Sequence, residues 1–339
     1  MLEINNRYLI FVMYLTTSIY LIKNRLDLHV PDLFYDAREV WYPLAKSLSK
    51  GGMLYVEYSD NKPPLFEYLN YLVYSTGHYI LVFHLLIALA NTVAAMLLYT
   101  YVERNGYSLA GITAGFLWLL TLPPTHGTII NVRSFASIGL LGALLLRSPT
   151  YVGISMGLAG LFSQFIVFAI PSIIAREFLT KDNISAIKYI LTVGLASLVT
   201  VAVCYASLAI PYGLASIPAA IQDTIISSNS YVSWERFSIL DPTWPFRIRG
   251  VLSQVLFVII PAIMYLVLKF RRGFSTDQIL SWSHDREIVL LLALFLSTLL
   301  IKSLLYYWIF PLLFISALAG KAVSVLYYEL MYPILLRHN

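Results

Sequence analysis

Long, nearly continuous apolar runs dominate this chain of 339 residues, and they constrain its fold more than any other feature. Runs such as 78–102 and 186–210 are longer than the roughly 20 apolar residues that a transmembrane helix needs. A membrane β-barrel would instead show alternating segments of about 10 residues. The chain is 59% hydrophobic and only 12% charged, which excludes a soluble enzyme, a disordered chain and a nucleic-acid-binding protein. We therefore predict an all-α, polytopic transmembrane helix bundle.

The predicted spans are apolar runs bounded by charged residues, glycine or proline. They cover about 8–22, 78–102, 107–122, 132–146, 151–175, 186–210, 250–268, 287–301 and 304–326. The run 151–175 is either one helix or two short helices folded back near Gln164, so we expect nine or ten spans. No small-residue cleavage site follows the first run, which is typical of a signal anchor. We predict a single transmembrane domain over residues 1–339 with no separate soluble domain.

The charges suggest an orientation in the membrane. With the N-terminus in the cytoplasm and a hairpin at 151–175, 12 of the 23 lysines and arginines lie inside and 11 outside. The positive-inside rule favours this orientation by a small margin, and the basic cluster at 269–272 adds a local signal. Two long polar segments, 23–64 and 211–249, then share the external face, and segments of this size are usually functional. The single cysteine, Cys204, excludes an intramolecular disulfide and a cysteine-based metal cluster.

The first external segment predicts interfacial amphipathic helices. Over residues 31–50, apolar residues recur at helical spacing: Leu33, Val40, Leu44 and Leu48. Such a helix lies along the membrane surface. Gly51 and Gly52 end it as a glycine C-cap, and a second interfacial helix can begin after the pair Pro63-Pro64.

Three stretches of this chain resemble GT-C glycosyltransferases, of the branch related to protein O-mannosyltransferases and aminoarabinose transferases. The first comprises Asp36, the helix after it, Gly51-Gly52, Leu54-Tyr55 and Asn61-Lys62-Pro63-Pro64-Leu65-Phe66-Glu67-Tyr68-Leu69. The second runs over 157–171, with Gln164 where the family usually carries lysine, and the third over 302–313. Together they cover about a quarter of the chain in the family's order. The resemblance implies an enzyme that takes a sugar from a polyprenyl-phosphate carrier to an acceptor on the external or lumenal face.

The resemblance also implies catalytic residues. Asp36 matches the acidic residue that acts as general base for the acceptor hydroxyl, in a reaction that inverts the anomeric centre. A hydroxyl is a poor nucleophile until a base takes its proton. The alternatives are that Asp36 caps the helix, or that Asp32, four residues earlier, is the base. Glu39 either contacts the substrate or pairs with Arg38 or Lys62.

We expect four residues near the donor phosphate: Lys62, Lys302, Arg133 and Tyr306. Lys62 matches the family's basic residue before the proline pair, and its alternative role is to face lipid headgroups. Arg133 and Lys302 stand at predicted outer ends of spans, where charge is costly unless it is paired or faces an aqueous cavity. Lys302 beside Tyr306 is a phosphate clamp or a snorkelling anchor. His126, alone in its loop, is more often structural than functional in such a setting.

The sequence indicates no cofactor. It lacks a glycine-rich nucleotide loop and a His-Glu-x-x-His zinc helix, which argues against a nucleotide-sugar donor. No acid-x-acid pair is obvious, so metal dependence is not indicated, and Asp60 fits a turn residue better than a metal ligand. The segment 228–249 is rich in tryptophan, tyrosine and charged residues. Two interpretations stay open for it: a surface that stacks on a sugar, or an aromatic belt at the membrane interface.

The expected partners are the lipid bilayer, a polyprenyl-phosphate-linked sugar donor and an unidentified acceptor glycan, lipid or protein, with no nucleic acid. We expect an integral, multi-pass membrane protein, in the plasma membrane of a prokaryote rather than in the ER membrane. Two alternative functions stay open. The chain is short and carries Gln164, which is compatible with a catalytically silent GT-C-like subunit that binds lipid. A transporter or flippase is disfavoured, because the charges lie at helix ends and no internal repeat is visible.

Overall fold

The computed structural model is all-helical in the parts of the chain that it describes, residues 2–104, 106–227, 244–271, 283–301 and 305–331. Beyond helices, these residues form one isolated bridge, between Leu54 and Tyr58. The helices are α1 (Leu2–Ile22), η1 (Lys23–Arg25), η2 (Val30–Asp32), η3 (Asp36–Trp41), α2 (Tyr42–Leu48), α3 (Pro64–Ser75), α4 (Tyr79–Glu103), α5 (Ser108–Thr121), η4 (Pro123–Thr125), α6 (Arg133–Leu145), α7 (Pro149–Gly160), η5 (Gln164–Ala169), α8 (Ile170–Thr180), α9 (Asn183–Ala206), α10 (Ala209–Tyr212), α11 (Ser216–Ile221), η6 (Gln222–Ile226), α12 (Trp244–Arg271), α14 (His284–Ile301), η10 (Leu305–Trp308), α15 (Ile309–Val325) and η11 (Leu326–Met331). The predicted all-α class is therefore confirmed for the described residues.

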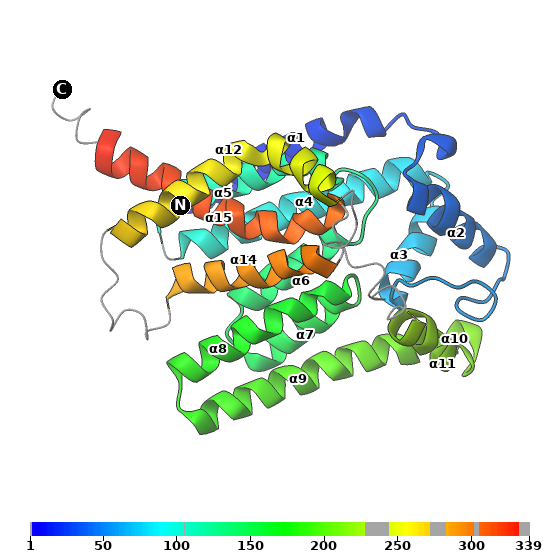
Figure 1. Cartoon of the computed structure of the whole chain (residues 1–339). Coiled ribbons are helices and arrows are strands. Elements are labelled where there is room, and N and C mark those ends of the chain that lie inside the picture. The colour runs from blue at the N-terminus through cyan, green and yellow to red at the C-terminus, as the bar shows by residue number, and fades with distance from the viewer. Residues whose placement is uncertain (1, 105, 228–243, 272–282, 302–304, 332–339) are drawn as a thin grey trace.

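Helix α15 forms the centre of the bundle. It packs along α5, α12 and α14, and 83% of its most apolar window is buried inside the protein. Its sequence is apolar on nearly every side, as a helix surrounded by other helices requires, and Lys321 is its one charged residue. Gly320 permits the closest approach, because an added Cβ there would lie 2.3 Å from the carbonyl oxygen of Ala110 in α5. This contact holds the central helix against its neighbour (Figure 1).

Helix α9 lies at the periphery, with only 11% of its apolar window buried. Leu191, Leu195 and Leu198 are exposed along its outer side, as lipid-facing residues would be. It packs against α7 at small residues: a Cβ added to Gly157 would lie 2.8 Å from Cβ of Thr200. The exposed side of α9 is therefore suited to an apolar surrounding rather than to water.

The predicted run 151–175 is two short helices and not one. Near Gly153, α7 meets Val193 and Ala196, and near Gly157 it meets Thr200, so α7 and α9 run in the same direction. Between them the chain turns back through η5 and α8, because Thr180, at the end of α8, lines one pocket together with Pro149, at the start of α7. Ser163 is extended (φ −150°, ψ 115°) and interrupts the helix after Gly160. The structure thus has the fold-back near Gln164.

Four described segments are long and apolar enough to cross a membrane: Tyr79–Glu103, Asn183–Tyr212, Arg249–Lys269 and Ile309–Glu329. Two more apolar helices, Ser108–Thr121 and Arg133–Leu145, are shorter. These segments are those of a membrane protein with transmembrane helices. The total of nine or ten spans and their orientation stay predictions.

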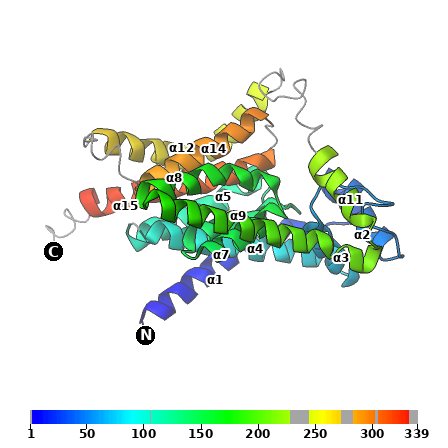
Figure 2. The ribbon, with the colours of Figure 1, turned by 90° about the horizontal axis from the view of Figure 1, so that it is seen from below.

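The polar connections gather at one end of the bundle. Helices α2, α3, α10 and α11 lie together at this end, whereas α1 begins and α15 ends at the opposite end (Figures 1 and 2). The predicted helix over 31–50 is shorter and covers Asp36–Leu48 as η3 and α2. Gly51 follows it at φ +91°, which fits the predicted glycine end. Leu44 and Leu48 are buried and Lys46 and Lys50 exposed, while the position of this helix on a membrane surface stays a prediction.

Candidate functional site

Asp36 begins the π-helical turn η3 at the polar end of the bundle. Turns of this kind are rare in proteins, and those that occur are often found at functional sites. The Asp36 side chain is half-buried, and among the described residues no backbone N–H donates a hydrogen bond to it. This arrangement does not match the alternative in which Asp36 serves as a helix cap.

Asp32 is held in a different way. Its Oδ2 accepts a hydrogen bond from the backbone N–H of His29 at 3.1 Å, and it closes the short turn η2. The side chain is exposed to solvent. Asp32 thus has a local structural role that Asp36 lacks.

Arg133 and Tyr307 are in contact, and Asp36 lies within electrostatic reach of Tyr307, although the three residues are far apart in sequence. Arg133 begins α6, is 7% exposed, and places its guanidinium carbon 4.3 Å from the ring centroid of Tyr307 in η10. The Arg133 guanidinium and the Asp36 carboxylate both act electrostatically on the Tyr307 phenol. A carboxylate that influences this phenol must lie near it. The fold therefore brings the η3 turn, the start of α6 and the η10 turn towards one place.

The loop before α6 supports this arrangement. Asn131 Oδ1 accepts hydrogen bonds from the backbone N–H groups of Arg133 and Ser134, each at 2.9 Å, and so caps the helix that Arg133 begins. The ring of Phe34 packs edge-on against His126 with centroids 5.1 Å apart. His126 thus has a packing contact to the segment that carries Asp36, and burial lowers its pKa. The predicted structural role of His126 agrees with this contact.

Lys62 lies at the other end of the η3 turn. Its Nζ is 5.8 Å from the ring centroid of Trp41, the last residue of η3, and donates a hydrogen bond to Asn61 Oδ1. Its backbone carbonyl accepts a hydrogen bond from the Tyr55 hydroxyl. The side chain is half-buried. Lys62 is therefore ordered by its own loop and lies beside Trp41, which ends the η3 turn that Asp36 begins.

Glu39 pairs with its sequence neighbour. Arg38 Nε lies 2.6 Å from Glu39 Oε1, and Arg38 also donates to the carbonyl of Pro31 at 3.1 Å. Both side chains of the ion pair are exposed by more than two fifths. This is one of the alternatives that the sequence allowed for Glu39, and a contact of Glu39 with substrate stays a prediction.

Two predicted site residues, Lys302 and Tyr306, have no described side-chain contacts. Lys302 lies outside the described residues, as does most of the polar stretch 228–249, up to residue 243. Tyr306 belongs to η10 next to Tyr307. Their predicted roles at the phosphate therefore stay predictions.

Gln164 is engaged in a structural contact. Its Nε2 donates to the carbonyl of Thr224 in η6, and the Thr224 hydroxyl lies 2.6 Å from the hydroxyl of Tyr205. Next to it, Ser59 Oγ donates to Asp223 Oδ2 at 2.6 Å. These bonds join the start of the second polar segment to the first one and to the fold-back. Gln164 is thus a neutral residue that links the fold-back to η6.

Sequence reasoning missed Glu67. This acidic residue of α3 is 0% exposed, and Asn70, one turn later on the same helix face, is equally buried. Asp60, predicted as a turn residue, is 9% exposed and lies close to Glu67. The signal was available: two polar residues spaced by three on one face of an otherwise apolar helix.

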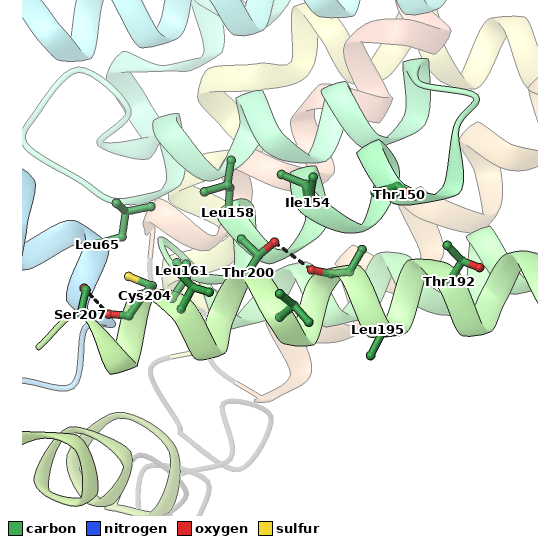
Figure 3. A pocket seen from close by; sticks show the side chains of 13 residues that line it. Leu65, Thr150, Ile154, Leu158, Leu161, Thr192, Leu195, Thr200, Cys204 and Ser207 are labelled. Carbon is green, nitrogen blue, oxygen red and sulfur yellow. Dashed lines mark hydrogen bonds between the residues drawn. The ribbon is translucent and has the colours of Figure 1, made fainter. Parts of the chain in front are cut away.

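An apolar groove of about 650 Å³ lies between α7 and α9. One end is lined by Leu65, Cys204 and Ser207, near the polar end of the bundle, and the other by Thr150 and Thr192 (Figure 3). The walls between these ends are formed by side chains such as Ile154, Leu158 and Leu195 (Figure 3). A long hydrocarbon chain has the shape and polarity to fill such a groove.

Comparison of the chain with protein-family models, with curated proteins and with solved structures found no match.

Proposed function

We propose that the protein is a multi-pass membrane glycosyltransferase of GT-C type, which moves a sugar from a polyprenyl-phosphate donor to an acceptor on the external or lumenal face. The observation that carries the proposal is the contact between Arg133 and Tyr307, with Asp36 within electrostatic reach of Tyr307, at the polar end. An accessible carboxylate beside a buried cation suits a reaction that removes a proton at one point and releases a phosphate at another. The nine or ten predicted spans and a location in a prokaryotic plasma membrane belong to this proposal.

The chemistry follows from the roles of these groups. Asp36 takes the proton of an acceptor hydroxyl, and that oxygen forms a bond to the anomeric carbon from the face opposite the donor phosphate. The bond between the anomeric carbon and the phosphate oxygen breaks, and the polyprenyl phosphate leaves with the electron pair. Arg133 and Lys62 stabilise the phosphate charge, because a guanidinium or an ammonium hydrogen-bonds to phosphate oxygens. A single displacement of this kind inverts the anomeric configuration.

The apolar groove between α7 and α9 supports a lipid-linked donor. Its end at Leu65 follows Lys62 by three residues in the sequence, so a chain lying in the groove would have its phosphate close to the polar end. The groove wall from Ile154 to Leu158 is apolar, which suits an isoprenoid chain better than a nucleotide. We assign no cofactor to this reaction.

The decisive experiment compares Asp36→Asn with Asp32→Asn in purified protein supplied with a panel of radiolabelled polyprenyl-phosphate sugars. Loss of a general base lowers the rate by about 10²–10⁴-fold, so Asp36→Asn should lose nearly all transfer. Asp32→Asn should keep it, because Asp32 only closes a turn. Undiminished transfer by Asp36→Asn would refute its role as base.

A catalytically silent lipid-binding subunit is the second candidate. It is favoured by Gln164, whose side chain is bonded to the Thr224 carbonyl where the family usually carries lysine. This function predicts saturable binding of polyprenyl phosphate by the wild-type protein with no transfer from any donor of the panel. Transfer from one donor would exclude it.

A further inference from the structure

One buried carboxyl group stands in the loop before helix α3, and a second stands in the first turn of that helix. Glu67 is 0% exposed and Asp60 is 9% exposed. The charge of Asp60 acts directly on the Glu67 carboxyl, so the two groups are neighbours. Asp60 Oδ1 accepts the backbone N–H of Asn61 at 2.6 Å, but Asp60 Oδ2 and Glu67 Oε1 are buried without a hydrogen-bond partner. Two neighbouring buried carboxylates would repel each other strongly, so the arrangement calls for a proton between them.

The surroundings hold Glu67 in place from the other side. Asn70 Nδ2 donates to Glu67 Oε2 at 3.2 Å and to the carbonyl of Trp41 at 2.8 Å. The Tyr79 hydroxyl donates to Asn70 Oδ1 at 2.7 Å. Both the nitrogen and the oxygen of the Asn70 amide therefore have hydrogen-bond partners. This chain of bonds joins α4, α3 and the end of η3. The carboxyl of Glu67 therefore has no freedom to turn to water.

We propose that Glu67 and Asp60 share one proton, with the Glu67 hydroxyl donating to Asp60, and that this bond positions Lys62 for the donor phosphate. The positioning role rests on the proposed function. Lys62 follows Asp60 by two residues, and its ammonium donates to Asn61 in the same loop. With one shared proton the pair carries a single negative charge, which one ammonium balances. Without the proton the pair carries two, which draws Lys62 away from the phosphate and repels the phosphate itself.

The electrostatic setting agrees with this geometry. Burial raises the pKa of Glu67 well above its usual value, and the charge of Asp60 and a hydrogen bond to it raise the pKa further. Asn70 and Lys62 act in the opposite direction. The other titratable groups around the pair come from its own loop, from α4 and from α10: Tyr55, Tyr79 and Tyr212. Each of these is a phenol, which is neutral in the range where a carboxyl pair loses its proton.

The test measures the affinity of the detergent-solubilised protein for undecaprenyl phosphate between pH 5 and pH 9. Wild type should lose affinity by on the order of tenfold as pH rises, a typical size for coupling between two sites. Glu67→Gln should keep its affinity at high pH, because the amide N–H still donates to Asp60 and cannot be lost. Glu57→Gln, an exposed acid of the same segment, is the matched control and should follow wild type. The comparison between variants removes the titration of the ligand itself.

Infrared difference spectroscopy gives a second measurement that needs no ligand. Wild type and Glu57→Gln should show the carbonyl stretch of a protonated carboxylic acid at neutral pH, and Glu67→Gln should lack it. Absence of this band in wild type overturns the shared proton, as does an identical pH profile of binding for Glu67→Gln and wild type. If wild type shows the band but binds no undecaprenyl phosphate at any pH, the shared proton stands and the proposed function fails. Because the band is read in wild type, a Glu67→Gln variant that does not fold still leaves the proposal open to refutation.

Discussion

Replacing Gly320 by alanine tests the contact on which the centre of the bundle depends. The added Cβ would lie 2.3 Å from the carbonyl oxygen of Ala110, 2.8 Å from the backbone nitrogen of Ala114 and 2.9 Å from its Cβ. Ordinary contact between such atoms needs about 3.5 Å, so α5 and α15 would have to separate by roughly 1 Å. The obstructing atoms are mostly backbone, which cannot rotate aside. Overpacking of this kind costs about 1–3 kcal/mol.

The loss should be visible as a lower free energy of unfolding in detergent micelles, followed by tryptophan fluorescence during titration with a denaturing detergent. Gly194→Ala is the matched control, since a Cβ at Gly194 in α9 would meet nothing within 4 Å. We expect the control to unfold like wild type or at slightly higher denaturant, because alanine favours a helix over glycine. If Gly320→Ala were as stable as Gly194→Ala, α5 and α15 would not be in the contact described, and the placement of Tyr307 ahead of α15 would lose its basis.

Three further outcomes are expected. Lys321→Met should destabilise the protein by about 3 kcal/mol, because the Asp285 carboxylate loses the ammonium 2.5 Å away and keeps only Lys269. An unchanged thermal unfolding temperature would contradict this. Arg133→Lys should weaken the binding of undecaprenyl phosphate about tenfold, because an ammonium loses the stacking on Tyr307 and the bidentate geometry; equal affinity in a titration would argue against the contact. The pKa of Glu67 is raised by folding, so its contribution to stability is complete below the unfolded pKa and is lost as pH rises toward the folded value. In wild type, this loss should lower the free energy of unfolding by at most about 1.4 kcal/mol per pH unit. Denaturation at several pH values should show that Glu67→Gln lacks this pH dependence, and a pH dependence equal to that of wild type would refute the expectation.

Much of the helical framework was readable from the sequence, because an apolar run with sharp polar ends has few alternatives in a membrane. The predicted run 78–102 is α4, Tyr79–Glu103, and the predicted run 132–146 is α6, Arg133–Leu145. Both runs end in charge or proline, which places the ends of the helices within one or two residues. The glycine end at Gly51 was readable for a similar local reason, since the backbone there is left-handed.

The fold-back near Gln164 could not be decided from the sequence. One long helix and two short ones bury the same apolar residues, so hydropathy is equal for both. The choice depends on α9, which accepts the glycine face of α7 at Gly153 and Gly157 and requires the chain to return first. Packing between distant segments made the decision.

The candidate site shows the same division. The sequence by itself determined an all-helical membrane protein with its polar chemistry in a few connections, and it singled out Asp36, Lys62 and Arg133 one at a time. Only the tertiary structure decided that Arg133 contacts Tyr307 within electrostatic reach of Asp36, and that Glu67 is buried beside Asp60. The physical reason is that hydrophobicity and charge act residue by residue along the chain. A shared proton or a stacked guanidinium, in contrast, depends on atoms that only the packed helices bring within a few ångströms of each other.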